Sequence, residues 1–68
     1  MKIIVELTNK ENASSSWNDP AKLIKKYPYH AKSTYGGGFF ENLDKIREFY
    51  SKFKNSEKIN GCGEWEVE

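Results

Sequence analysis

Only two side chains offer the chemistry of a nucleophile and its base, because the 68 residues include one histidine, His30, and one cysteine, Cys62. A catalytic thiol needs a base within hydrogen-bond reach, so these residues would have to meet across paired strands. A single histidine beside lysines is more often a solvated surface group, and a cysteine between two glycines is more often part of a turn. We therefore expect no catalytic residue and a protein that is not an enzyme.

Metal and cofactor binding lack the residues that they need. Zinc takes four nitrogen or sulfur ligands, and the two soft candidates are far apart in the sequence. Glu64, Glu66 and Glu68 would lie on one face of a strand and attract a hard cation, but no loop that would wrap such an ion accompanies them. We expect these acids to line a solvated strand, and we expect neither a metal nor a cofactor.

The stretch that looks most functional is a basic aromatic segment, defined here as residues 22–38. No acid occurs between Asp19 and Glu41, and lysines there alternate with tyrosines. Lysines neutralise phosphates and exposed tyrosine rings stack on bases, so this composition is typical of a nucleic-acid surface. Tyrosines are equally common at protein interfaces, and the lysines could simply solvate one side of a helix. The candidate binding residues of this segment are Lys22, Lys25, Lys26, Tyr29, His30, Lys32 and Tyr35.

The triple glycine Gly36, Gly37 and Gly38 ends this segment and precedes a predicted helix. Glycines at a helix N-terminus present backbone N–H groups to a phosphate or carboxylate, so the three are candidate anion-binding residues. Neither the GxxxxGK[ST] nor the GxGxxG spacing is present. The structural interpretation is a sharp turn that lets Tyr35 and Phe39 both pack inward.

Local sequence patterns predict the strands, loop and helix of the first half of the chain. Residues 2–8 are rich in β-branched side chains that alternate, which predicts a strand. Residues 9–18 are polar and read as a loop whose far end Trp17 would anchor. Asp19 and Pro20 have the pattern of a helix N-cap and first helical residue, and Pro28 ends that helix. Residues 29–35 alternate again and predict a second strand.

The second half predicts a long helix and a final strand. Apolar residues recur at helical spacing, so we expect a helix over residues 39–54. In residues 63–68, Trp65 and Val67 alternate with glutamates, which predicts a half-exposed edge strand. The order β-α-β-α-β predicts a small two-layer α/β or α+β domain, with about three strands and two helices packed on one face.

Length and charge limit the class of protein. The chain suffices for a single domain, residues 1–68, and its net charge of +1 favours neither a strongly basic nucleic-acid binder nor a DNA mimic. The longest apolar run has three residues, far below the roughly 18 of a membrane span. No secretory cleavage site follows the first residues. We expect a cytoplasmic protein that does not enter a membrane.

In size and style the chain resembles the small accessory or inhibitor proteins of phages and mobile elements, including anti-CRISPR and other anti-defence proteins: it is short, rich in Lys and Asn, and poor in His and Cys. The resemblance implies a small binding protein that docks on a larger protein or ribonucleoprotein and modulates or inhibits it. Trp17, the basic aromatic segment, or Glu64 and Glu66 would supply the docking surface, and the C-terminal edge strand would allow a homodimer. The alternative is a nucleic-acid or phosphorylated-ligand binding module that uses the basic aromatic segment.

Overall fold

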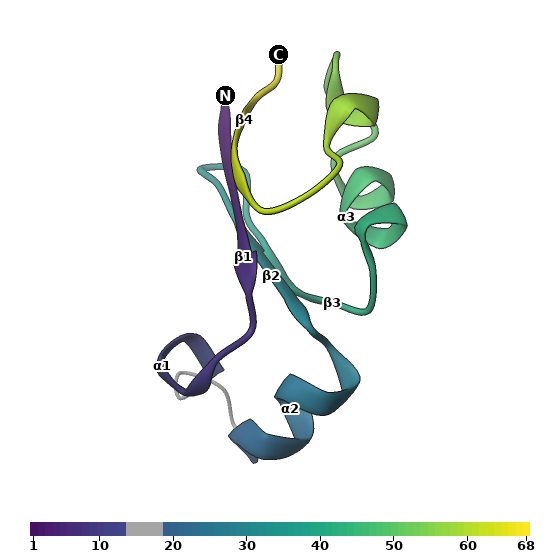
Figure 1. Ribbon diagram of the computed structural model, residues 1–68. Coiled ribbons are helices and arrows are strands. Elements are labelled where there is room, and N and C mark those ends of the chain that lie inside the picture. The colour runs from purple at the N-terminus through teal and green to yellow at the C-terminus, as the bar shows by residue number, and fades with distance from the viewer. Residues whose placement is uncertain (14–18) are drawn as a thin grey trace.

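Strand β1 (Lys2–Leu7) forms where its alternating pattern predicts and lies at the centre of the sheet. β2 (Tyr29–Lys32) and β4 (Gly63–Glu66) flank it, and β3 (Gly38–Phe40) pairs with the outer side of β2. All the pairings are antiparallel, in the order β3-β2-β1-β4 (Figure 1). This computed structural model describes residues 1–13 and 19–68, and within those ranges the sheet has 4 strands, one more than predicted.

The helix that Asp19 and Pro20 predict is present as α2 (Pro20–Lys26). The Asp19 carboxylate accepts a hydrogen bond of 3.0 Å from the Ala21 N–H, which satisfies one of the free donors of the first turn. Tyr27 closes the helix just before Pro28, as the restriction on residues before proline requires. α2 therefore begins and ends as the sequence indicates.

The prediction of a loop for residues 9–18 is wrong in its first part, because α1 (Lys10–Ala13) is a single helical turn. Asn9 and Asn12 hold it: each side-chain oxygen accepts the backbone N–H of the other at 2.9 Å. α1 contacts α2 at one end of the sheet (Figure 1). Trp17 lies outside the described residues.

The predicted helix over residues 39–54 is wrong at both ends. Its first residues form β3, and α3 (Leu43–Phe49) begins only after Asn42, whose side chain accepts the Lys45 N–H at 3.0 Å. α3 ends at Phe49, followed by turns and a short 3-10 helix, η1 (Ser56–Lys58). Phe39 lies in a strand and not in a helix because this segment pairs with β2. The local spacing of apolar residues carries no information about that contact.

The core lies between one face of the sheet and α3, so the domain has the predicted two layers and belongs to the α+β class (Figure 1). Ile3 and Val5 of β1 and Ala31 of β2 point to this face, where they meet Ile46 of α3 and Tyr50, the residue that caps the end of α3. All of these side chains are buried. Because burial of apolar area is the main favourable term in folding, this contact holds α3 against the sheet.

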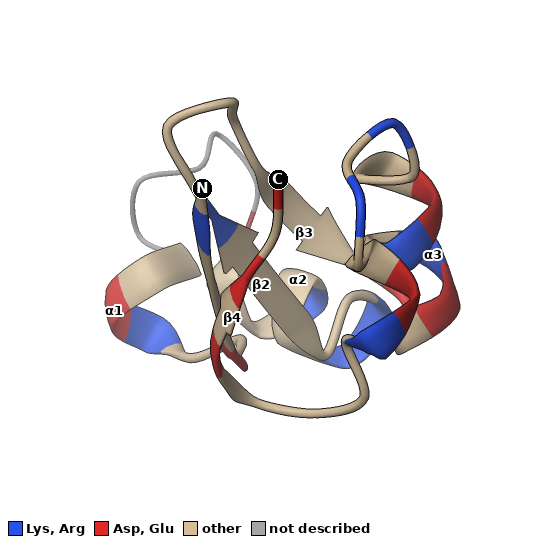
Figure 2. Cartoon of the chain, turned by 90° about the horizontal axis from the view of Figure 1, so that it is seen from above, with Lys and Arg blue, Asp and Glu red and all other residues tan. Residues whose placement is uncertain are grey.

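The opposite face of the sheet is polar. Paired residues share a face, and the pairs Glu6 with His30 and Ile4 with Lys32 lie away from the core. Seen from above in Figure 2, acidic residues follow β4 while α3 carries both signs of charge. No helix in the described residues is long and apolar enough to cross a membrane.

Candidate binding groove

The hairpin between β2 and β3 is fixed by one glycine. A Cβ atom added at Gly37 would lie 2.0 Å from the carbonyl oxygen of Ala31, so only a residue without a side chain lets the turn come this close to β2. The neighbouring Gly36 has a φ of 134°, which also favours glycine. Its carbonyl oxygen accepts hydrogen bonds from the Tyr50 hydroxyl at 2.6 Å and from the Ser33 hydroxyl at 2.9 Å. The hairpin is therefore tied to α3.

This geometry corrects the premise of the predicted anion site at Gly36, Gly37 and Gly38. No helix follows the three glycines directly, because β3 begins at Gly38 and α3 begins at Leu43. The glycines consequently present no helix N-terminus to a phosphate or carboxylate. The turn itself is present, but the expectation that Tyr35 and Phe39 both pack inward is wrong, because Tyr35 is 46% exposed and Phe39 pairs with His30 on the face of the sheet away from the core.

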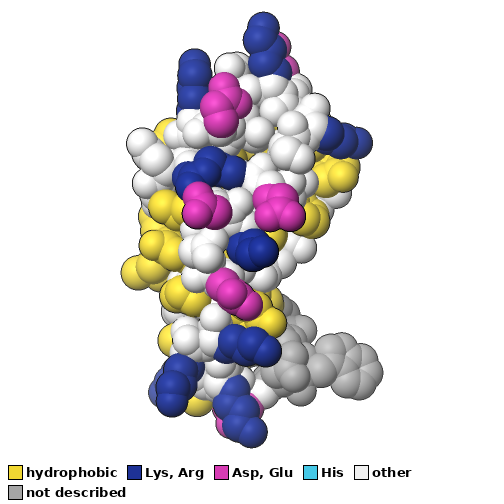
Figure 3. All heavy atoms as spheres, turned by 90° about the vertical axis from the view of Figure 1, so that its right-hand side faces the viewer, with side chains coloured by type: hydrophobic (Ala, Val, Ile, Leu, Met, Phe, Trp, Pro, Cys, Tyr) yellow, Lys and Arg dark blue, Asp and Glu magenta, His cyan; other side chains and the backbone are white. Residues whose placement is uncertain are grey.

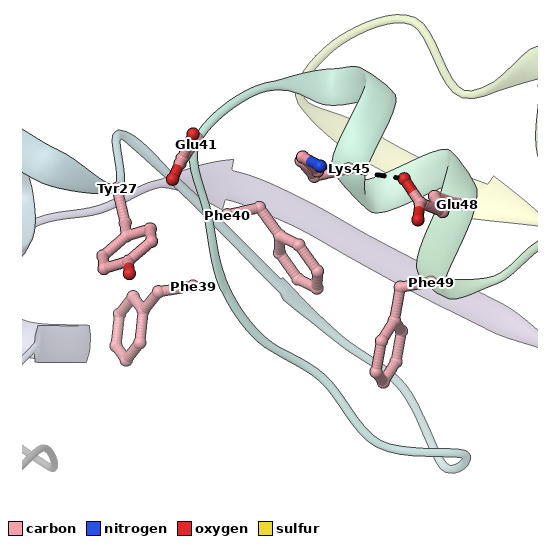
Figure 4. Close-up of a pocket in the computed structure, with 7 residues that line it drawn as sticks. All are labelled: Tyr27, Phe39, Phe40, Glu41, Lys45, Glu48 and Phe49. Atoms are coloured by element: carbon pink, nitrogen blue, oxygen red, sulfur yellow. Dashed lines mark ion pairs between the residues drawn. The ribbon is translucent and has the colours of Figure 1, made fainter.

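A groove of about 370 Å³ opens along β3, between the end of α2 and the exposed side of α3 (Figure 4). Four aromatic side chains form most of its wall. In Figure 4 the rings of Tyr27 and Phe39 lie on one side of the β3 backbone, and those of Phe40 and Phe49 lie on the other. The remaining lining residues are Glu41, Lys45 and Glu48.

The aromatic wall is well packed yet open to solvent. The rings of Phe40 and Phe49 meet edge to face with centroids 5.5 Å apart, and Phe49 also contacts Tyr50 at 4.8 Å. Tyr35 extends the cluster, with its ring 5.7 Å from that of Phe49. Phe49 is still 41% exposed and Tyr35 46% exposed. Figure 3 shows hydrophobic side chains gathered beside the charged residues of this side of the molecule. Contiguous exposed apolar surface of this kind often marks an interaction site.

The rim of the groove is weakly acidic. Lys45 and Glu48, one helical turn apart, form an ion pair of 3.9 Å, and both side chains are largely exposed. In Figure 4, Glu41, Lys45 and Glu48 lie along one side of the four rings, with Lys45 between the two acids, and Glu41 makes no ion pair with any described residue. Two acids against one lysine leave a formal charge of −1 at the rim. An exposed ion pair contributes little to stability, so these side chains are available to a partner.

A second, polar cleft lies on the other face of the sheet, where Glu6 meets His30 and Asn12. His30 Nδ1 lies 3.0 Å from Glu6 Oε1, and Asn12 Nδ2 donates to the same oxygen at 3.3 Å. Burial alone would raise the pKa of Glu6, but these hydrogen bonds and the charge of Lys32 outweigh it and hold the pKa below its ordinary value. The His30 ring also packs on Phe39 with centroids 4.9 Å apart, so the cleft and the groove share the β2–β3 pair.

The structure distributes the basic aromatic segment over several surfaces. Lys22, Lys25 and Lys26 are exposed on α2, with Lys26 Nζ 5.4 Å from the centre of the Tyr27 ring. Tyr29 is half-buried against the core, whereas Lys32 is exposed on the opposite face of the sheet. Tyr35 and His30 belong to the aromatic cluster and the polar cleft described above. Residues that are adjacent in sequence therefore do not form one binding surface.

Two glutamate side chains near the C-terminus form ion pairs with residues at the start of the chain. Glu64 pairs with Lys2 at 3.8 Å, and Glu66 accepts a hydrogen bond of 3.2 Å from the N-terminal ammonium of Met1. His30 and Cys62 do not meet through paired strands, since β1 lies between β2 and β4. Among the residues that the structure describes, no three His, Cys, Asp or Glu side chains gather to hold a metal.

No protein-family model matches the chain, and neither the curated proteins nor the solved structures include a significant match. Any functional argument for this molecule consequently depends on its own surface. Sequence alone does not reveal the aromatic groove, because the helical spacing predicts that Phe39 and Phe40 begin a helix. The signal that could have revealed it is Asn42, a favourable N-cap residue that marks the true start of α3.

Proposed function

We propose that the protein is a non-enzymatic binding protein that docks on a larger protein through the aromatic groove. The observation that carries this proposal is the position of β3. It is an edge strand, and half-exposed aromatic rings line the groove beside it. Aromatic side chains supply large contact areas with little loss of conformational freedom, and they are enriched among the residues that dominate protein interfaces. Occupation of a functional segment of the partner would modulate or inhibit it, in line with the compositional resemblance to small inhibitor proteins.

The charge of the groove favours a protein partner over a nucleic acid. Of the charged residues that line it, Glu41 and Glu48 outnumber Lys45, and this net negative charge would repel phosphates. A nucleic-acid surface remains a second candidate on α2. There, Lys22, Lys25 and Lys26 follow one another at helical spacing, all are exposed, and the helix contains no acid. The two candidates occupy different elements, so substitutions separate them.

The experiment is affinity capture from a lysate of the source organism at physiological salt, with and without nuclease. The bait is the wild-type protein, Phe49→Ala, or the matched control Leu7→Ala, which truncates another exposed apolar side chain outside the groove. We expect a stoichiometric protein that survives nuclease, is captured by Leu7→Ala, and is lost with Phe49→Ala. Equal capture by both variants would contradict docking at the groove. Nucleic acid that is lost on replacement of Lys22, Lys25 and Lys26 by glutamate would establish the α2 candidate instead.

A further inference from the structure

We propose that the partner contributes an extended segment, which binds in the groove as an added strand on the free edge of β3 and carries a basic residue opposite the acidic rim. This inference rests on the proposed function and specifies how the groove is occupied. β3 is one of the two outer strands of the sheet, and no strand of the described chain pairs with its outer side. An outer strand offers unpaired backbone N–H and C=O groups, which an extended peptide can satisfy.

The side chains around β3 suit a strand better than a helix. Successive residues of a strand point to opposite faces, and the groove has an aromatic pair on each side of the β3 backbone (Figure 4). One set of alternate side chains of the added strand would contact Tyr27 and Phe39, and the other set would contact Phe40 and Phe49. A docked helix presents a single apolar face and would use only one of these pairs.

The rim charge specifies the sign of the segment and argues against a second copy of this chain. Glu41 has no ion-pair partner among residues 1–13 and 19–68. A lysine or arginine in the added strand would form an ion pair with it. Two copies joined at β3 would each bring a rim of formal charge −1 to the same interface, and like charges on two partners disfavour association. The predicted ligand is therefore a foreign, basic segment with apolar residues on both faces.

The probe is a library of random linear peptides of about ten residues, the upper length of an ordinary strand, displayed and selected against the intact protein. We expect selected sequences to combine apolar residues on both alternating faces with at least one lysine or arginine. One selected peptide is then synthesised and its affinity measured by calorimetry. Phe49→Ala should weaken it by about tenfold or more, as loss of a hot-spot aromatic does, whereas Leu7→Ala should leave it unchanged.

Backbone N-methylation of this peptide, one residue at a time, tests strand addition directly. An N-methyl amide cannot donate a hydrogen bond, so affinity should fall at the alternate residues whose N–H faces the three-residue strand β3, and persist at the residues between them. Loss without this alternation would overturn strand addition. If such a peptide still depends on Phe49, docking at the groove stands and only the mode of binding is wrong.

Charge reversal tests the second half of the inference. Glu41→Lys should weaken the selected basic peptide, and the control Glu57→Lys, an exposed acid in η1 outside the groove, should not. If Glu41→Lys and Glu57→Lys lower the affinity of the peptide equally, the charge acts only as a long-range attraction. That result would overturn the role of Glu41. Failure of the library to yield any binder would overturn the added strand. The lysate experiment with Phe49→Ala would then decide separately whether the groove docks a folded partner.

Discussion

Replacement of Gly37 by alanine is the most direct test of how β3 is positioned. The added Cβ would lie 2.0 Å from the Ala31 carbonyl oxygen and 2.8 Å from the Cα atom of Lys32, and both are backbone atoms that cannot rotate away. Close carbon–oxygen contacts in proteins are roughly 3.3 Å, so the turn would have to move by about 1.3 Å. A displacement of this size separates β3 from β2, where Gly38 pairs with Ala31.

The expected loss follows from these contacts. Steric overpacking of a fixed site costs about 1–3 kcal/mol, and each strand hydrogen bond that breaks adds about 1 kcal/mol. We expect Gly37→Ala to lower the free energy of unfolding by about 3 kcal/mol, or the melting temperature by about 12–24 °C at this chain length. Because the protein is small, a loss of this size is a large fraction of its total stability.

The neighbouring Gly38 supplies a matched control, since a Cβ added there meets no heavy atom within 4 Å. Gly38→Ala should leave stability unchanged or raise it by about 0.5 kcal/mol, because alanine restricts the unfolded chain. Urea unfolding followed by far-UV circular dichroism measures both variants. If the two free energies agree within about 0.5 kcal/mol, the close approach at Gly37 does not position β3 and the reasoning is refuted.

Further predictions test contacts of three other residues. Tyr50→Phe should cost about 1 kcal/mol in urea titrations, because the hydroxyl no longer donates to Gly36. Burial raises the pKa of Tyr50 above its ordinary 10.0, so the wild type should lose stability as pH rises beyond that value, where only the unfolded phenol ionises, and Tyr50→Phe should lack this part of the loss. The lowered pKa of Glu6 predicts that stability falls as pH drops below 4.5, and Glu6→Gln should reduce this loss in unfolding measured at acidic pH. Asn42→Ala should cost about 1 kcal/mol in thermal unfolding, since the cap of α3 is lost, whereas the exposed Asn60→Ala should be neutral.

The elements that sequence alone predicts correctly are those whose signals are local. Asp19 and Pro20 determine the start of α2 because a cap and its first turn are neighbours in the chain. The strand at residues 2–7 follows from alternation within six residues. Trp65 and Val67 face inward as their alternation with glutamates predicts, Trp65 half-buried against the core and Val67 buried.

The error at Phe39 has a non-local cause. Phe39, Leu43, Ile46 and Tyr50 do recur at helical spacing, and the last three face the core from α3 and its cap. Phe39 instead pairs with His30 on the other face of the sheet, which depends on the close approach of the Gly37 turn. Pairing between two strands is not visible in the periodicity of either one.

The aromatic groove cannot be predicted from the sequence for a related reason. Its walls come from the end of α2, from β3 and from α3, which only the folded chain brings together. The basic aromatic segment is continuous in sequence, but strand alternation sends Tyr29 and His30 to opposite faces and leaves the lysines of α2 apart. Composition identified residue types suited to binding, and topology determined which of them share a surface.

The two edges of the sheet differ in a way that limits how many segments one molecule can take up. β3 carries apolar rings at its edge, whereas β4 carries Glu64 and Glu66, and charged side chains on an edge strand discourage pairing. A sheet receptive at both edges can be linked to the next copy, and that copy to another, without end. If a partner segment adds to β3 as we propose, the charged β4 edge would leave each molecule with one receptive edge, so growth would stop after a single strand. The proposal therefore implies a one-to-one complex.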